Sequence, residues 1–465
     1  MTIKLARNET IHFVGIGGIG MSGLAIIMHG LGFKIQGSDI SNNKNIERLK
    51  KNKIKVFIGH KKQNINSSTL LVVSSAIKKN NPEYLSAKNK KLPIYKRGEV
   101  LGHIVSLMKN IVVAGSHGKT TTTSLISGIF TSAKLDPTII NGGVLNSIGN
   151  SAKLGKSNWC VLESDESDGS FLKVPQTYSI VTNIDEEHLD YYKTFKKLKL
   201  NFVNFIEKTP SIGKSFLCID DKNVKSVLKK VKNKNYITYG TDANSNFNIQ
   251  NIIQKKDFSK FDLKILLPGK KINKIKNIKI PIIGLHNIRN ATAAIAVSFS
   301  IGISSNLIKK GLLNFKGVQR RFNHLFNYKN SSFFDDYAHH PTEIVEVLNG
   351  VKQVYREKKI ICIFQPHRIS RLKYLRKKFS FAFNKADSVI LCPVYKAGEN
   401  LRLGFNYYNF AKEISKNSKV QLTMIKNQFE LAKLMKHTIC GEEVIIGMGA
   451  GSISNWVRQL PELLR

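Results

Sequence analysis

Short apolar runs alternate along the chain with amphipathic stretches of helical period. The runs at 11–14, 111–114 and 443–446 each break into a glycine-rich turn that leads into a helical pattern. A short apolar strand, a turn and a helix in that order begin a βα unit, and repeated βα units build parallel sheets covered by helices. The pattern therefore predicts an α/β protein with three doubly wound units.

Length and pattern together predict three domains. The chain has 465 residues, and domains of ~150 residues give about three. Between about 237 and 283 the pattern changes to short alternating segments, which are typical of an antiparallel β insertion. The predicted domains are 1–107, 108–322 and 323–465, with Rossmann-like first and third domains and a central phosphate-loop domain.

Composition limits the class of protein. Apolar residues make up 42% of the chain, which is enough to form several cores. The sequence shows no apolar N-terminal segment and no run of ~18 apolar residues, so we expect a cytoplasmic protein without a signal peptide or membrane span. Five scattered cysteines are expected to be reduced packing residues and not a zinc site or a disulfide framework.

The net charge of +41 could attract nucleic acid or an anionic membrane. The basic residues are mostly lysine, however, and they are spread among Asn and Ile, as at 46–55 and 270–279. No aromatic-interleaved basic motif is present. We expect a solvated lysine surface, no specific nucleic-acid partner and some attraction of anionic substrates. A nucleic-acid-dependent ATPase remains the alternative that would use this charge.

The first glycine turn matches the dinucleotide-binding spacing. Gly15, Gly17 and Gly20 follow a strand, and Asp39 comes 19 residues after the last of them, at the end of the next strand. Such turns also bind other diphosphates. A nicotinamide oxidoreductase is therefore possible from this turn alone, but it would leave the second glycine turn unexplained.

The second turn reads Gly115-Ser-His-Gly-Lys119-Thr-Thr121 after an apolar strand. Backbone N–H groups and a helix N-terminus cradle phosphate, the lysine reaches the outer phosphates, and a threonine hydroxyl ligates magnesium. The usual motif has a glycine where Val113 stands, so this loop is shorter. The turn predicts a nucleoside triphosphate with Mg²⁺.

Acidic and imidazole groups follow the next two strands. Glu163 ends one strand and opens the acidic stretch 163–171, which favours a metal role in so basic a chain. His188 follows the strand at 178–182, and the carboxyl ends of both strands should lie beside the phosphate loop.

Two further polar groups follow another predicted strand or open a helix. His286, Asn287 and Asn290 on an alanine-rich helix could read a purine or cap the helix. His339 and His340 follow two acids; without a further ligand at helical spacing, an anion or ribose site is favoured over zinc.

A pair of arginines follows another strand. Arg368 and Arg371 are expected to share a helix face and to clamp a carboxylate or phosphate. Lysine is the habitual surface base of this chain, so arginine here indicates a geometric requirement.

Seven motifs of this sequence, taken in their order along the chain, resemble those of the Mur ligase family, and they extend over nearly the whole chain. The acidic stretch resembles the alanine-adding members, whereas members that recycle murein tripeptide differ there and in the first glycine loop. The short phosphate loop is the family's own form, and Ser116 stands where threonine is commoner. The motifs are at 12–23, 115–121, 163–171, 182–188, 286–290, 335–341 and 365–368.

The resemblance implies a first domain for UDP, a central ATPase domain and a third domain for the amino-acid end of the site. It implies an ATP-dependent ligase that joins L-alanine to the lactyl carboxylate of UDP-N-acetylmuramate through an acyl phosphate. The products are ADP and phosphate, and the pathway is peptidoglycan precursor synthesis, which serves the cell wall, cell shape and division. A monomer and a homodimer both remain open.

The resemblance also implies roles for individual residues. Lys119, Glu163 and His188 would be catalytic, with Thr120 and Glu163 on one Mg²⁺ ion and His188 on a second. ATP would contact Gly115, Ser116, His117, Gly118, Lys119, Thr120, Thr121, His286, Asn287, Asn290 and Arg321. The other substrates would contact Gly15, Gly17, Gly18, Gly20, Met21, Ser22, Asp39, His339, His340, His367, Arg368 and Arg371.

Overall fold

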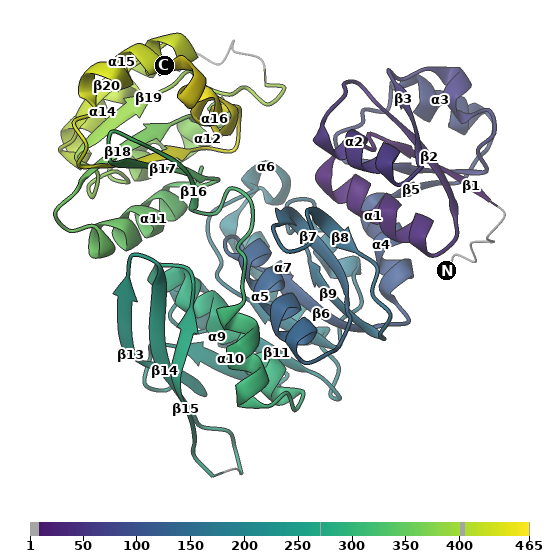
Figure 1. Cartoon of the computed structure of the whole chain (residues 1–465). Helices are drawn as coiled ribbons and strands as arrows, with labels where there is room; N and C mark the ends of the chain where they lie inside the picture. Colours follow the sequence, from purple (N-terminus) through teal and green to yellow (C-terminus); the bar gives the residue numbers. More distant parts are fainter. Residues whose placement is uncertain (1–8, 270, 400–404, 465) are drawn as a thin grey trace. The chain divides into compact units, whose positions relative to one another are not determined.

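The computed structural model describes residues 9–269, 271–399 and 405–464, and Figure 1 shows the order of their elements. They form two compact units. The first unit runs up to Ile252 and includes Phe261–Ile280 and Arg289–Lys316. The second comprises Ile253–Lys260, Pro281–Ile288 and the chain from Gly317 on. Among the described residues, no helix is both long and apolar enough to cross a membrane.

A five-stranded parallel sheet, ordered β3-β2-β1-β4-β5, opens the first unit. The chain leaves β1 to one side through β2 and to the other through β4, so the first glycine turn lies at the switch point where such sheets bind ligands. The strands are β1 Thr10–Val14, β2 Lys34–Asp39, β3 Lys55–Ile58, β4 Leu70–Val73 and β5 Ile94–Lys96; the helices are α1 Ile19–Gly30, α2 Lys44–Lys51, η1 Lys62–Ile65, α3 Pro82–Asn89 and α4 Arg97–Val105.

The second sheet has ten strands in the order β15-β14-β13-β12-β11-β10-β6-β9-β7-β8. β6 lies between β10 and β9 and is parallel to both, so the phosphate loop after β6 is flanked by the ends of both strands. The predicted β insertion is present as β13–β15 at one edge. The strands are β6 Lys109–Ala114, β7 Thr138–Leu145, β8 Asn150–Lys153, β9 Trp159–Glu163, β10 Tyr178–Val181, β11 Lys214–Cys218, β12 Tyr236–Gly240, β13 Phe247–Lys255, β14 Phe258–Ile265 and β15 Asn273–Ile280.

Along the chain, helices connect many of the strands of this second sheet. The apolar core includes Val112 and Leu162 of the sheet and Phe202 of a helix, each with no exposed side-chain surface. The helices are α5 Lys119–Ser132, η2 Ser170–Lys173, α6 Leu189–Tyr192, α7 Phe195–Glu207, α8 Lys222–Leu228, α9 Leu285–Ser300 and α10 Ser305–Leu313.

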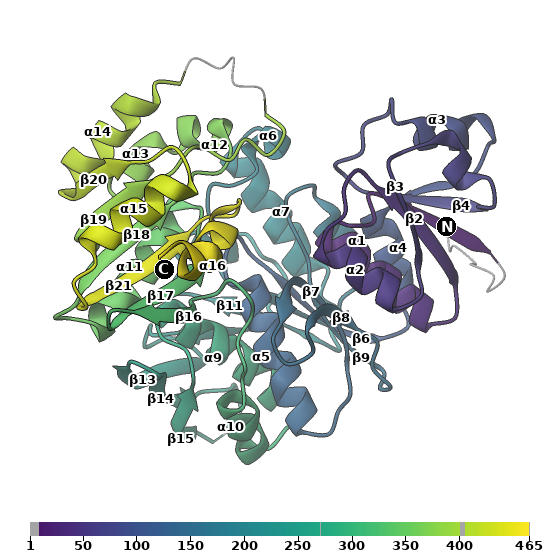
Figure 2. The ribbon, with the colours of Figure 1, turned by 45° about the horizontal axis from the view of Figure 1, so that its top comes forward.

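The third sheet, in the second unit, is ordered β16-β17-β21-β18-β19-β20, and only its β16–β17 pair is antiparallel. The strands of this sheet contribute to two hydrophobic cores. One core is covered by α11, α13 and α14, and the other is covered by α15 and α16 (Figure 2). The strands are β16 Asn323–Tyr328, β17 Ser331–Asp336, β18 Lys359–Phe364, β19 Ser388–Leu391, β20 Gln421–Met424 and β21 Glu443–Met448; the helices are α11 Pro341–Val354, α12 Ile369–Tyr374, α13 Arg376–Ser380, α14 Tyr407–Ser418, α15 Gln428–Thr438 and α16 Ile453–Leu463.

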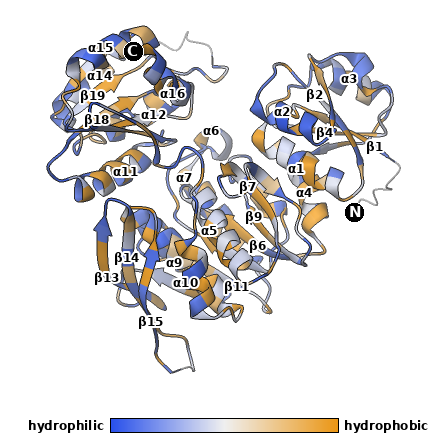
Figure 3. Cartoon of the chain, viewed as in Figure 1, coloured by the Kyte–Doolittle hydropathy of each residue, from blue (hydrophilic) through white to orange (hydrophobic). Residues whose placement is uncertain are grey.

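The predicted α/β class with three sheets is confirmed, while the domain boundaries stay predictions. Figure 3 shows why the hydrophobic pattern was informative: β18 and β19 are largely hydrophobic, and α2 is largely hydrophilic. The cysteine prediction is wrong at one position. Four thiols are buried, but Cys440 is exposed, because it lies in the turn before β21 and not in a strand.

A buried polar network lies inside the first sheet. The carboxylate of Glu83 accepts hydrogen bonds from Ser38 Oγ (2.5 Å) and Asn64 Nδ2 (2.6 Å), and it lies 3.2 Å from His60 Nδ1 and 3.5 Å from His12 Nε2. Burial alone would raise the pKa of Glu83, but the hydrogen bonds from His12, Ser38 and Asn64 lower it to about 2. Glu83 therefore joins β1, β2 and α3 through one charged group.

We predict that Glu83→Gln destabilises the first unit by on the order of 2–3 kcal/mol at pH 7. Because the folded pKa is depressed, the stabilisation is present above about pH 4.5 and is lost as the pH falls toward 2. Calorimetric unfolding at several pH values should therefore show a shallower acid dependence in the variant. Glu47→Gln, an exposed acid on α2, is the matched control; equal pH slopes for Glu83→Gln and wild type would contradict the prediction.

Candidate functional site

The phosphate loop joins β6 to α5 through two glycines that no other residue could replace. Gly115 and Gly118 have φ of +129° and +82°, and a Cβ on Gly115 would lie 2.2 Å from Thr182 Oγ1. A Cβ on Gly118 would lie 2.5 Å from Asn290 Oδ1. Within the described part of the chain, no side chain caps the N-terminus of α5, which leaves the usual site for an anion.

The loop after β10 braces the phosphate loop. The side-chain oxygen of Asn183 accepts a hydrogen bond from the His117 amide (2.9 Å), and the backbone carbonyl of Asn183 accepts one from the Ser116 amide (3.1 Å). Thr182 Oγ1 donates to His117 O (2.6 Å), and the Asp185 amide donates to Ser116 Oγ (2.8 Å). The predicted proximity of the Thr182–Asp185 turn to the phosphate loop is therefore confirmed, and its role here is to fix the loop.

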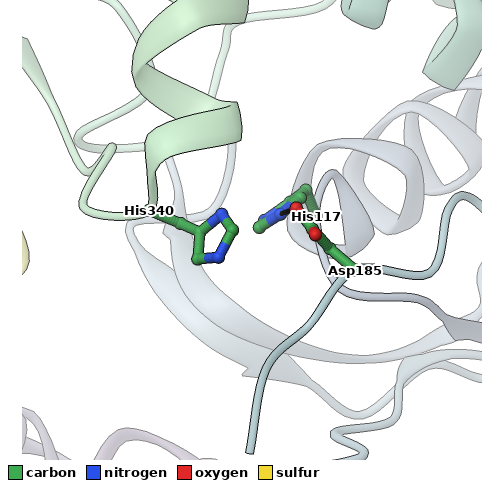
Figure 4. Close-up of side chains that lie close together, drawn as sticks. All are labelled: His117, Asp185 and His340. Atoms are coloured by element: carbon green, nitrogen blue, oxygen red, sulfur yellow. Dashed lines mark hydrogen bonds and ion pairs between the residues drawn. The ribbon is translucent and has the colours of Figure 1, made fainter. Parts of the chain in front are cut away.

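His117 points to the same turn. Figure 4 shows the side chains of His117 and Asp185 close together, and Nε2 lies 3.3 Å from Oδ2. Both side chains are partly exposed. His340, also labelled there, belongs to the second unit, where its Nδ1 accepts a hydrogen bond from the Thr342 amide (3.3 Å) at the start of α11. Pro341 is the first residue of that helix.

Lys119 is the first residue of α5 and is held by its own loop. Its Nζ donates to Gly115 O (2.7 Å) and Glu166 Oε2 (2.8 Å), and it lies 3.4 Å from Ser116 O. Burial alone would lower the pKa of Lys119, but the carboxylates of Glu166, Asp165 and Glu163 outweigh burial and raise it. The side chain is therefore a largely buried cation in an acidic setting.

The acidic stretch places its carboxylates in two positions. Glu163 accepts a hydrogen bond from the Gly142 amide (2.7 Å). Asp165, Glu166 and His188 form a second cluster, whose ligand atoms all lie within 4.8 Å of one another. Oxygen ligands and one imidazole suit a divalent cation, and Glu166 Oε1 is buried without a hydrogen-bond partner among the described residues.

The sequence predicts Glu163 as a metal ligand, which stays a prediction, and it gives no separate role to Asp165 and Glu166. The signal was available, because both lie in the acidic stretch, but strand-end position favoured Glu163. Thr120 is buried on the first turn of α5, where its carbonyl accepts a hydrogen bond from Asn141 Nδ2 (3.3 Å). Its role as a ligand stays a prediction.

Of the three polar residues predicted on α9, Asn290 lies against the phosphate loop at Gly118. His286 and Asn287 make local contacts within the second unit. His286 Nδ1 lies 3.7 Å from Glu346 Oε2, and Asn287 Nδ2 donates to Ile283 O (2.7 Å). Their contact with ATP stays a prediction.

The first glycine turn closes on its own acid. Gly17 N donates to Asp39 Oδ2 (2.8 Å), and Asn45 Nδ2 donates to Gly17 O (2.8 Å). Gly20 packs against Arg97, because a Cβ there would lie 3.2 Å from Nη1. Met21 and Ser22 are buried in α1, and Ser22 Oγ donates to Ile19 O. Arg97 and Asn45 were not found from the sequence because they lie outside the turn. The predicted ligand roles in this part of the chain all stay predictions: Gly15, Gly17, Gly18, Gly20, Met21, Ser22 and Asp39.

In the second unit, predicted residues gather at the carboxyl ends of β17 and β18. His339 Nδ1 donates to Tyr337 O (2.9 Å), and the Arg321 guanidinium lies 5.4 Å from the Tyr337 ring centroid. Asp336 accepts hydrogen bonds from the amides of Ala338 and Phe322. Burial raises the pKa of Asp336 to about 6, although the Arg321 charge opposes this.

His367 stacks on Tyr395, with ring centroids 5.6 Å apart and planes at 10°, and it meets His339 edge-on at 5.8 Å. Its Nδ1 accepts a hydrogen bond from Arg371 Nη1 (3.2 Å). Burial, then the nearby charges of His339, Arg371 and Arg368, lower its pKa to about 3. His367 is therefore neutral, with its proton on Nε2. Tyr395 has no sequence signal of its own and was missed.

The prediction that Arg368 and Arg371 share a helix face is wrong. α12 begins at Ile369, and Arg368 precedes it with a φ of +65°. The turn from β18 uses this residue to connect strand to helix, and its amide donates to Tyr395 O (2.9 Å). Arg371 is helical and turns to His367. Whether they bind a carboxylate stays a prediction.

Comparisons with known proteins agree with this geometry along the chain. Family models match as the Mur ligase catalytic domain at residues 10–109, the Mur ligase middle domain at 113–298 and the Mur ligase glutamate ligase domain at 320–451. The chain is 66% identical to the UDP-N-acetylmuramate--L-alanine ligase of Pelagibacter ubique over 464 residues, covering 100% of each. It is 41% identical to the ligase of that name from Brucella ovis over 456 residues, covering 98% of this chain and 97% of the relative.

Solved structures give the same picture. The UDP-N-acetylmuramate-alanine ligase of Thermotoga maritima has a TM-score of 0.82 and 27% identity, with 98% of this chain and 99% of that chain covered. A murein peptide ligase from Psychrobacter arcticus has a TM-score of 0.72 at 21% identity over 98% and 99% of the two chains, which shows the fold alone.

We predict that His367 stays neutral from pH 8 down to about pH 4, since its pKa is lowered to about 3. Nitrogen-15 NMR of labelled histidine should show one tautomer, protonated on Nε2, across this range. Arg371→Ala removes a nearby positive charge, so the pKa of His367 should rise in that variant. Arg356→Ala, at an exposed site, is the control and should leave the pKa of His367 unchanged. Titration of His367 near pH 6 in the wild type would refute the assignment.

Proposed function

The chain belongs to the Mur ligase family, and on that premise we propose that it joins L-alanine to the lactyl carboxylate of UDP-N-acetylmuramate at the expense of ATP. The observation that carries the proposal is the 66% identity, over the full length of both chains, to a relative named for that activity. The phosphate loop, with its buried lysine and neighbouring acids, supports the ATP part independently.

The proposed reaction has two steps. The substrate carboxylate attacks the γ-phosphorus of ATP, the bond to the bridging oxygen of ADP breaks, and an acyl phosphate forms. The neutral amine of L-alanine then attacks the acyl carbon, and phosphate leaves from the tetrahedral intermediate as the nitrogen loses a proton. Activation is needed because a carboxylate is a poor electrophile.

Lys119 supplies positive charge to the transferring phosphoryl group, and the braced loop presents its backbone amides. Mg²⁺, when bound, would offset the remaining triphosphate charge, with Thr120 and Glu163 on one ion and His188 on a second. The cluster of Asp165, Glu166 and His188 supports this second position. The other proposed ATP contacts are Gly115, Ser116, His117, Gly118, Thr121, His286, Asn287, Asn290 and Arg321.

We assign the UDP moiety to the first glycine turn in residues 1–107, ATP to residues 108–322 and the amino-acid end to residues 323–465. The amino-acid group is His339, His340, His367, Arg368 and Arg371. The neutral imidazole of His367 and the positive charges of Arg368 and Arg371 suit a carboxylate better than a cation. Peptidoglycan precursor synthesis in the cytoplasm is the setting that we propose.

We predict that Lys119→Ala lowers turnover by more than 100-fold, because removing a charge aimed at the phosphoryl group costs at least ~3 kcal/mol of transition-state stabilisation. Binding of UDP-N-acetylmuramate should stay within a few fold, since that site lies on another sheet. Phosphate release with L-alanine, glycine and L-serine measures both activity and selectivity. Lys196→Ala, at an exposed site on α7, should behave as wild type. Lys119→Ala activity above about one tenth of wild type would refute the role of the lysine.

Glu163→Gln and His188→Ala are each expected to raise the Mg²⁺ concentration needed for half-maximal turnover, or to abolish turnover, because each removes a proposed ligand. Phosphate release over a magnesium titration is the measurement. If both variants give the wild-type titration curve, these residues are structural.

A further inference from the structure

The ammonium group of Lys119 is fully occupied within its own neighbourhood. Its three N–H donors face Gly115 O at 2.7 Å, Glu166 Oε2 at 2.8 Å and Ser116 O at 3.4 Å. Two of these acceptors belong to the loop that must receive phosphate. A phosphate oxygen can reach this ammonium only by replacing one of the three.

Glu166 is more deeply buried than Lys119, its ion-pair partner. Its side chain is 1% exposed, against 11% for Lys119, and its backbone carbonyl accepts a hydrogen bond from Tyr192 Oη. Taking a carboxylate out of water is costly unless an opposite charge compensates it. Lys119 is the cation that lies in contact with it.

Further acidic groups and one histidine lie around the pair of Lys119 and Glu166. Glu163 and Asp165 lie close enough to act on the charge of Lys119, and His188 Nε2 lies 3.8 Å from Glu166 Oε1. That oxygen is buried and lacks a hydrogen-bond partner among the described residues. It faces the position where Asp165 and His188 could hold a cation with it.

We infer that Glu166 is a positioning residue that holds Lys119 retracted in the nucleotide-free loop, and that nucleotide and divalent cation displace this pair together. The phosphate takes the ammonium, and the cation takes the released carboxylate. No covalent bond changes in this exchange. The inference rests on the proposed function only in that the site binds adenine nucleotides.

The exchange has a measurable thermodynamic consequence. Without a cation, nucleotide must draw Lys119 away and leave a buried carboxylate uncompensated, so binding should be weak. With the cation, both charges keep partners. Nucleotide and cation should therefore be strongly coupled in the wild type, and the coupling should depend on the charge of Glu166.

The first test is binding of ADP, measured by calorimetry in EDTA and in Mg²⁺. The wild type should bind ADP at least about 30-fold more tightly with Mg²⁺, within the usual range of coupling. Glu166→Gln should bind ADP about 10-fold more tightly than wild type in EDTA, and its Mg²⁺ effect should fall below about 5-fold. Its turnover should fall, because the lysine loses the group that positions it.

Two variants control this test. Asp190→Asn makes the same charge change at an exposed site on α6 and should keep the wild-type coupling. Glu166→Asp keeps the charge and should retain weak ADP binding in EDTA. If Glu166→Gln binds ADP in EDTA no more tightly than wild type, the inference is wrong.

A second measurement does not need Glu166→Gln to fold. Lys119→Met removes the cation that competes for Glu166, so Mn²⁺ alone, followed by electron paramagnetic resonance, should bind at least about 10-fold more tightly than to wild type. Lys196→Met should show no change. Unchanged Mn²⁺ affinity in Lys119→Met would overturn the inference. Failure of the wild type to bind ADP even with Mg²⁺ would instead remove the proposed function and the inference with it.

Discussion

A lysine ammonium buried among carboxylates is the interaction on which the central part of this structure depends. Lys119 begins α5 directly after β6, and β6 lies between the two strands whose carboxyl ends supply its surroundings. β9 leads into the acidic stretch with Glu166, and β10 leads into the turn that braces the loop. The strand order 10-6-9 therefore determines both the charge around the lysine and the shape of the loop that carries it.

Two glycines near this lysine let a side chain approach the backbone closely. Gly118 lies against the Asn290 amide and Gly142 against the Glu163 carboxylate, at distances where a Cβ would collide. Each glycine lets a polar side chain from a distant part of the chain approach the backbone around the phosphate loop. The loss of conformational freedom that glycine brings is offset by contacts that a larger residue would exclude.

Sequence reasoning predicted most of the architecture because its signals are local. A strand, a glycine turn and a helix can be recognised in about twenty residues, and each predicted glycine turn lies where expected. It was incomplete or wrong where the outcome depends on tertiary packing. Recognising that Glu166 turns toward Lys119 required knowing how the acidic stretch folds, and placing Arg368 required knowing that the chain leaves β18 with a positive φ. Tyr395 became visible only as the ring on which His367 stacks.

The net charge of +41 and the chemistry of the site are separate properties of the chain. At the phosphate loop the local sign is reversed: Glu163, Asp165 and Glu166 occur within four residues, in a protein with 32 acids against 73 basic residues. Surface lysines act over about 8 Å at physiological ionic strength, so they can attract polyanionic substrates but cannot select among them. Selection falls to the buried groups, where screening is weak. A basic protein can therefore keep an acid-rich site, because Glu166, the most deeply buried of these three carboxylates, is paired with Lys119 at 2.8 Å and not with the surface charge.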